Sequence, residues 1–123
     1  MKLLNLLIQK FFRTWTKSRK SEMPTPKMYV LVRSDLSDTY RLVQGSHALA
    51  QFVLDKPEHF ALWNNGTIVF LSVRGLKDLR IWLYRLQSAG KVHALFCEPD
   101  LDGQMTAIAC YDTGEIFTDL KLA

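Results

Sequence analysis

One stretch, residues 27–50, most constrains the fold of this chain. It opens with a continuous apolar run over residues 28–32, which is typical of a central β-strand covered on both faces. The run stops at Arg33, and Ser37 or Asp38 can then cap a helix that begins near Tyr40 and extends to about Leu54. A buried strand followed directly by a long helix predicts an α/β fold.

The predicted helix carries polar residues on one side. Four of them recur at i, i+4, i+7 and i+11 and form one ridge: Tyr40, Gln44, His47 and Gln51. The apolar side is formed by Leu42, Val43, Leu49, Ala50, Val53 and Leu54. The polar ridge is thus expected beside the carboxyl end of the strand, where ligands bind in open α/β sheets. Gly45 costs about 1 kcal/mol relative to alanine, which indicates either a close approach to its backbone or tight packing on the sheet.

The rest of the chain continues to alternate strands and helices. A short helix is expected from Pro57 through Trp63, and a long one, closed by Gly90, around residues 76–86. Further strands are predicted over residues 67–73, 92–97 and 105–111, followed by a short turn or helix through Leu120. Helical crossovers make the first three strands parallel, and the short link before the fourth makes an antiparallel hairpin. We therefore predict a three-layer α/β fold, with a four-stranded mixed β-sheet and helices on both faces in the order β-α-α-β-α-β-β.

Charge divides the chain near residue 27. Residues 1–27 hold seven Lys or Arg and one Glu, a net charge of +6, whereas residues 28–123 hold nine Lys or Arg and eleven Asp or Glu, a net charge of −2. We assign residues 1–26 to a basic amphipathic helical extension with a linker, and residues 27–123 to the α/β domain. The slight negative charge of the domain argues against strong nonspecific binding to nucleic acid.

The basic extension is open to three interpretations. Apolar residues at helical spacing alternate with Lys and Arg over residues 3–20, but the segment is too short and too charged to span a bilayer. It could lie on an anionic membrane surface, dock onto a partner or onto the domain, or be a loosely ordered extension. It lacks the features of a signal peptide.

The two cysteines, Cys97 and Cys110, lie in apolar runs, as expected of buried free thiols. Since free thiols are typical of a reducing compartment, we predict a cytoplasmic protein.

Polar side chains follow the predicted parallel strands at one edge of the sheet. They are Arg33, Ser34 and Asp35 after the first strand, Arg74 after the second, and Glu98 and Asp100 after the third. Such a cluster beside a helix N-terminus can hold a phosphate or orient a water, whereas solvated ion pairs at loop ends are the alternative interpretation. The sequence contains no P-loop, dinucleotide-binding, HExxH or nucleophile-elbow motif, and we predict neither a cofactor nor a metal site.

Three segments are similar to those of a known enzyme family. They are the strand ending in Arg33-Ser34-Asp35-Leu36, the helix segment Gln44-Gly45-Ser46-His47-Ala48, and Met105-Thr106-Ala107-Ile108-Ala109. In type and order they resemble the type-2 peptidyl-tRNA hydrolases over about residues 27–120. The resemblance implies hydrolysis of the ester that links a peptide to tRNA, with tRNA or peptidyl-tRNA as the partner.

The resemblance also implies a site. Asp35, Gln44, Ser46 and His47 match the helix-site motif of the family, Thr106 matches a threonine near its active site, and Glu98 or Asp100 is the nearest equivalent of its late aspartate. The segment that carries this aspartate in the family is shortened here. The catalytic residues expected on this basis are Glu98, Asp100 and Thr106. The expected substrate-binding residues are Asp35, Tyr40, Arg41, Gln44, Ser46 and Arg74.

The sequence departs from the family at its loop lysine. Tyr40 stands at that place, and the nearest cation, Arg41, stays protonated and cannot act as a general base. One hypothesis is a divergent hydrolase in which Arg41 and Arg74 hold the tRNA end, Glu98 or Asp100 orients the water, and Thr106 or backbone donors stabilise the oxyanion. The alternative is a catalytically inactive binding module on the same fold, recruited to a membrane or protein by residues 3–20. A homodimer is left open in both.

Overall fold

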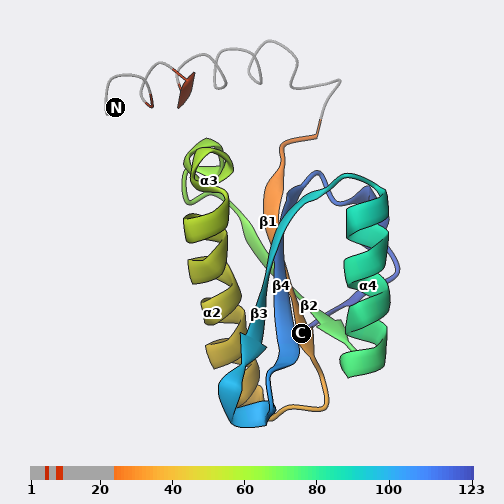
Figure 1. The fold of residues 1–123 in the computed structure, drawn as a ribbon. Helices are drawn as coiled ribbons and strands as arrows, with labels where there is room; N and C mark the ends of the chain where they lie inside the picture. Colours follow the sequence, from red (N-terminus) through yellow and green to blue (C-terminus); the bar gives the residue numbers. More distant parts are fainter. Residues whose placement is uncertain (1–4, 6–7, 10–23) are drawn as a thin grey trace.

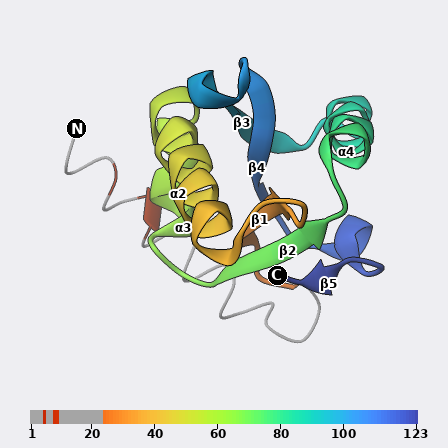
Figure 2. The ribbon, with the colours of Figure 1, turned by 90° about the horizontal axis from the view of Figure 1, so that it is seen from below.

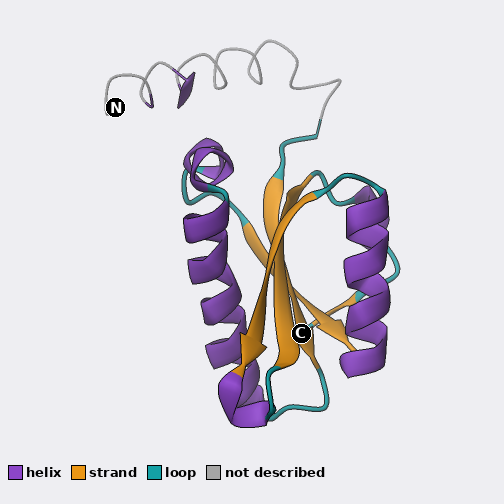
Figure 3. Cartoon of the chain, viewed as in Figure 1, coloured by secondary structure: helices purple, strands orange, loops and turns teal. Residues whose placement is uncertain are grey.

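One mixed β-sheet lies at the centre of the molecule (Figures 1 and 3). The structure is a computed structural model that describes residues 5, 8 and 9 and residues 24–123. The strands are β1 (Lys27–Arg33), β2 (Ile68–Val73), β3 (Val92–Glu98), β4 (Gln104–Asp112) and β5 (Lys121–Leu122). The α-helices in the described part are α2 (Asp38–Asp55), α3 (Pro57–Trp63) and α4 (Leu76–Ser88), and single turns of 3-10 helix are η1 (Pro99–Leu101) and η2 (Glu115–Phe117).

The strand order is β3-β4-β1-β2-β5. β1 and β2 pair in parallel, and β4 lies antiparallel to both of its neighbours, β1 and β3. β3 therefore runs in the same direction as β1 and β2, and the carboxyl ends of the three strands lie at one edge of the sheet. The predicted common direction of the first three strands is confirmed.

The predicted four-stranded sheet with its β-α-α-β-α-β-β order is wrong, because the sheet has five strands. β5 pairs antiparallel with β2 through only two residues, with Leu122 opposite Leu71 and Lys121 opposite Ser72. A strand of two residues is too short to show an alternating hydrophobic pattern. The chain enters β5, beside β2, after a turn at Gly114 (φ 102°) and the 3-10 turn η2, which stand where a single short turn or helix was expected.

The helices form layers on either side of the sheet (Figures 1 and 2). α2 packs against β1, β3 and β4, while α4 packs mainly against β4 and β1. Alternate residues of β1 contribute to the two cores, as expected of a strand covered on both faces. Val30 packs with Ala48 and Phe52 of α2 in one core, and Leu31 packs with Leu79 of α4 in the other.

The polar and apolar sides predicted for α2 do not correspond to its exposed and buried sides. Its buried residues are Gln44, Gly45, Ala48 and Phe52. Five members of the expected apolar side are exposed: Leu42, Val43, Ala50, Val53 and Leu54. A Cβ atom on Gly45 would lie 2.5 Å from the Phe70 ring and 3.2 Å from Val30 Cγ1. The tight-packing interpretation of Gly45 is therefore confirmed, and the smallest side chains of the helix set the face that meets the sheet.

The basic extension lies mostly outside the described residues. Within it, Asn5, Ile8 and Gln9 are helical, and the Gln9 side chain donates a hydrogen bond of 3.3 Å to the Ala61 carbonyl of α3. In the described part of the chain, every helix is too short or too polar to cross a membrane.

Candidate functional site

A hydrogen-bonded network joins α2 to the ends of β3 and β4. The Thr106 hydroxyl donates to Gln44 Oε1 at 2.5 Å, and Gln44 Nε2 donates to Glu98 Oε1 at 3.2 Å. The Tyr40 hydroxyl donates to the same Glu98 oxygen, also at 3.2 Å. These residues, here called the Glu98 network, include four of the predicted site residues: Tyr40, Gln44, Glu98 and Thr106.

A β-bulge positions Thr106. Phe96 pairs with Ala107, but the next residue, Cys97, pairs with Met105, so Thr106 is the extra residue on β4. A bulge re-aims a side chain, and here the hydroxyl contacts α2 rather than a neighbouring strand. Thr106 Oγ1 also lies 3.5 Å from the Phe96 carbonyl. Because a hydroxyl carries one proton, the shorter contact with Gln44 is the main hydrogen bond.

Glu98 is the charged centre of the network. Its Oε1 atom accepts both hydrogen bonds, and within the described part of the chain no donor is bonded to Oε2. The second oxygen can therefore accept a proton or a hydrogen bond from a water or a ligand. Desolvation, and next the hydrogen bond to Glu98, raise the pKa of Tyr40. The Tyr40 hydroxyl thus stays protonated at neutral pH and acts as a donor.

A second group, here called the Arg33 clamp (Arg33, Asp35 and Gln104), lies beside the network. The buried Arg33 guanidinium donates to both Asp35 oxygens, at 3.0 and 2.7 Å, and to Gln104 Oε1 at 2.9 Å. The hydrogen bonds from Arg33 lower the pKa of Asp35. Gln104 is opposite Glu98 in the sheet. The clamp therefore ties the loop after β1 to the start of β4, one residue pair away from the bulge.

Asp35 is thus engaged by Arg33 rather than placed in the Glu98 network. Gln104 was missed by the sequence prediction. Its only signal is its place immediately after a tight turn, in which Asp102 and Gly103 have φ angles of 55° and 74°. A glutamine after such a turn has no distinctive pattern, so its partner could be identified only from the strand pairing.

The other predicted substrate-binding residues lie apart from the network. Arg41 forms an ion pair with Asp38, and its buried Nε has no hydrogen-bond partner in the described part. Arg41 lines a separate cavity of about 280 Å³ beside Phe70. The exposed Ser46 hydroxyl donates to the Leu42 carbonyl of its own helix at 2.8 Å.

Arg74 and Asp100 complete the predicted set. Arg74 leaves β2 toward α4, on the other side of the sheet, where its Nε lies 3.8 Å from Asp78 Oδ2. Asp100 is exposed on η1, near enough to Tyr40 for its charge to contribute to the raised pKa of that hydroxyl. The predicted site is therefore divided among the Glu98 network, the Arg33 clamp, the α4 side of the sheet, and two residues of α2 outside the network, Arg41 and Ser46.

The histidine and cysteine side chains considered from the sequence lie outside the Glu98 network. The His47 ring stacks on Phe96, with ring centroids 4.4 Å apart and an angle of 9° between the planes. Cys110 is buried, and burial raises the pKa of its thiol to about 12, but Cys97 is exposed, contrary to the prediction. Among the described residues, no group of three or more His, Cys, Asp or Glu side chains is arranged to hold a metal ion.

Comparison with known proteins supports the fold. No model of a protein family matches the sequence, and no curated protein matches it. A solved structure of a protein of unknown function from Agrobacterium tumefaciens strain C58 is similar, with a TM-score of 0.61 over 82% of this chain and 99% of that chain. Because the two sequences are 15% identical, the likeness concerns the fold alone.

Proposed function

We propose that this protein is a divergent peptidyl-tRNA hydrolase-like enzyme, which hydrolyses the ester between a peptide and tRNA. The Glu98 network is the observation that supports the proposal most. Three of its members, Gln44, Glu98 and Thr106, are residues whose sequence surroundings resemble the helix motif, the late acidic position and the last strand of that family. They lie in three separate segments of the chain, and they meet around a single carboxylate.

In this proposal Glu98 is the general base. Its Oε2 atom takes a proton from a water whose oxygen attacks the ester carbonyl, and the ribose oxygen leaves with that proton. Tyr40 and Gln44 hold Oε1, which fixes the plane of the carboxylate. Thr106 is fully buried and its hydroxyl donates a hydrogen bond to Gln44, so it acts as a positioning residue and does not contact the substrate.

Substrate binding follows from the position of the cations. Arg41 lines the separate cavity beside Phe70 and is partly exposed, and we assign it to a phosphate of the tRNA end away from the reacting ester. Arg74 lies on the other side of the sheet and has no part in this site. The basic residues of the first 27 positions, with their net charge of +6, supply further attraction for the tRNA backbone.

The test is release of the peptide from N-blocked aminoacyl-tRNA by the full chain. Glu98→Gln keeps the shape of the side chain but removes the base, and we expect kcat/KM to fall about 100-fold. Glu58→Gln, on the exposed surface of α3, is the matched control and should leave the rate unchanged. If the unmodified protein releases no more peptide than a reaction without enzyme, the proposal fails. If Glu98→Gln is fully active, the assignment of the base fails.

A second candidate function is a catalytically inactive binding module on the same fold. The observation that favours it is the outward side of α2, where Leu42 and Leu54 are 61% and 76% exposed and Val43 and Val53 are also exposed. Exposed apolar groups gathered on one helix are typical of contact surfaces. In this proposal residues 3–20 recruit the chain to a membrane or a protein. Liposome co-sedimentation that is unchanged when residues 1–22 are deleted would contradict the membrane version.

A further inference from the structure

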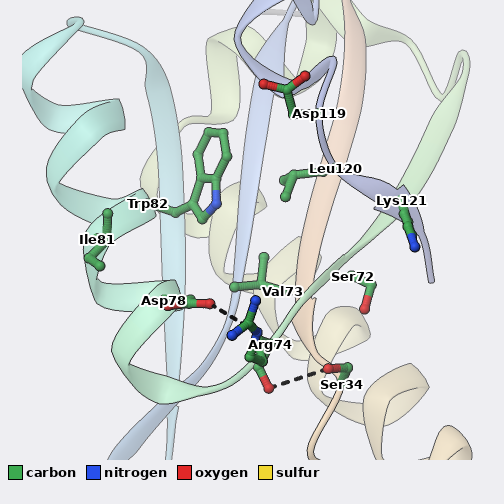
Figure 4. Close-up of a pocket in the computed structure, with 10 residues that line it drawn as sticks. All are labelled: Ser34, Ser72, Val73, Arg74, Asp78, Ile81, Trp82, Asp119, Leu120 and Lys121. Atoms are coloured by element: carbon green, nitrogen blue, oxygen red, sulfur yellow. Dashed lines mark hydrogen bonds and ion pairs between the residues drawn. The ribbon is translucent and has the colours of Figure 1, made fainter.

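A cavity of about 490 Å³ lies between α4 and the edge formed by β2 and β5 (Figure 4). It is on the face of the sheet opposite α2, so it is distinct from the Glu98 network. Its volume is in the range that small-molecule sites occupy. Its charged and hydroxyl-bearing lining consists of Ser34, Ser72, Arg74, Asp78, Asp119 and Lys121.

An unpaired donor faces this cavity. Trp82 is only 7% exposed, and within the described part of the chain its indole N–H donates no hydrogen bond, although Trp63 donates to the Thr67 carbonyl at 2.8 Å. The indole nitrogen is directed toward Val73 and Leu120 of the cavity lining (Figure 4). The Trp82 nitrogen is not among the buried side-chain atoms that lack a partner, so solvent reaches it through the cavity, and an acceptor on a ligand would take the place of a water there.

Only the edge of the Trp82 ring is available to a ligand. The Arg85 guanidinium lies over the ring, 4.0 Å from its centroid, and the Phe117 ring packs at 5.4 Å in a tilted arrangement. These contacts hold the indole in place and cover its ring. The ligand would therefore present an oxygen to the N–H and would not stack on the indole.

The charges of the lining favour an anion at one end of the cavity. The Arg74 side chain is 91% exposed, and its one ion pair with a residue of the described part of the chain, Asp78, is a long one at 3.8 Å. The hydroxyl of Ser34 donates to the Arg74 carbonyl at 3.3 Å, which places a second polar group beside the guanidinium. Asp119 lies at the opposite end of the cavity from Arg74 (Figure 4). A negative group therefore binds best at the exposed part of the Arg74 guanidinium that the long pair with Asp78 leaves open.

We propose that this cavity binds a small organic anion, with a carboxylate or phosphate group on an apolar body. The anionic group contacts Arg74, one of its oxygens accepts the Trp82 N–H, and the body packs against Val73, Ile81 and Leu120. The site is independent of the proposed hydrolysis. Arg74, which the sequence suggested as a ligand of tRNA, thus acquires a different role.

The test follows the indole N–H signal of Trp82 in proton–nitrogen NMR spectra of the full chain, with Trp82→Phe identifying the signal. Phenyl phosphate and benzoate have the same apolar body and different anionic groups, inorganic phosphate has no body, and benzyl alcohol has no charge. We expect the Trp82 signal to shift saturably with phenyl phosphate, benzoate or both, while the Trp63 signal stays in place. Inorganic phosphate and benzyl alcohol should bind more weakly.

Two variants decide the result, one at Arg74 in the loop before α4 and one at Arg80 on α4 itself. Arg74→Gln should weaken binding about tenfold, because it removes one charge-assisted contact. Arg80→Gln changes an exposed arginine of the same helix outside the cavity and should have no effect. No saturable shift with either organic anion, or a shift that Arg74→Gln leaves unchanged, would overturn the proposal.

Discussion

At the scale of single residues, Gln44 explains how a polar side chain can occupy the centre of α2's buried face. A buried amide is tolerated only when its carbonyl and its amino group both have partners. Thr106 supplies the donor for Oε1, and Glu98 accepts from Nε2. Because the carbonyl end is fixed by Thr106, the amino end must point to Glu98. The orientation of the carboxylate therefore depends on a hydroxyl that lies in a β-bulge and touches no solvent.

Thr106→Val tests this dependence. Valine has nearly the same shape but leaves Gln44 Oε1 buried without a donor, and we expect the free energy of unfolding to fall by about 1–3 kcal/mol. The measurement is urea denaturation of the full chain. Thr106→Ser keeps the hydroxyl and should retain most of the stability. Equal stability of the valine variant and the unmodified protein would show that the hydrogen bond makes no net contribution.

At the scale of elements, the position of α2 could be predicted but its orientation could not. The capping residue was among the two that the sequence suggested, since the Ser37 hydroxyl accepts a hydrogen bond from the Tyr40 amide at 3.2 Å. The orientation depends instead on Gly45 and Ala48, which let the helix approach β1 and β2, and on the partners of Gln44 in distant strands. A pattern of apolar and polar residues contains no information about those partners, so the exposed Leu42 and Leu54 were assigned to the wrong environment.

The substitution Gly45→Ala has two opposite effects on the stability of this element. Alanine is favoured over glycine in a helix by about 1 kcal/mol. The added methyl group would, however, lie 2.5 Å from the Phe70 ring, and forcing extra atoms into a packed interface costs about 1–3 kcal/mol. We expect a net loss of stability in thermal unfolding. The control is a double-mutant cycle with Phe70→Leu, which makes room for the methyl group, so that the two changes together should cost less than their sum.

At the scale of the whole molecule, the common edge of the parallel strands could be predicted, because helical crossovers fix the direction of β1, β2 and β3. That edge brings Glu98 to the start of α2, although the two are far apart in the sequence. The bulge at Thr106 and the strand β5 could not be predicted. The first depends on the register between β3 and β4, and the second is a two-residue pairing with β2.

The strand order also predicts how stability is distributed. β1 lies between β4 and β2 at the centre of the sheet, and Val30, Leu31 and Val32 are fully buried. β5 is an edge strand of two exposed residues, and the Ala123 amide beyond it bonds to the Phe70 carbonyl at 3.0 Å. Amides in a buried central strand open only with global unfolding, whereas a short edge strand opens locally.

We therefore expect native-state hydrogen exchange to be slowest in β1 and many times faster at Leu122 and Ala123. With added urea, the exchange of the β1 amides should accelerate with the slope of global unfolding, and that of the β5 amides should change little, because local opening exposes little surface. Protection at Ala123 equal to that in β1 would contradict this distribution and would place β5 in the same cooperative unit as the centre of the sheet.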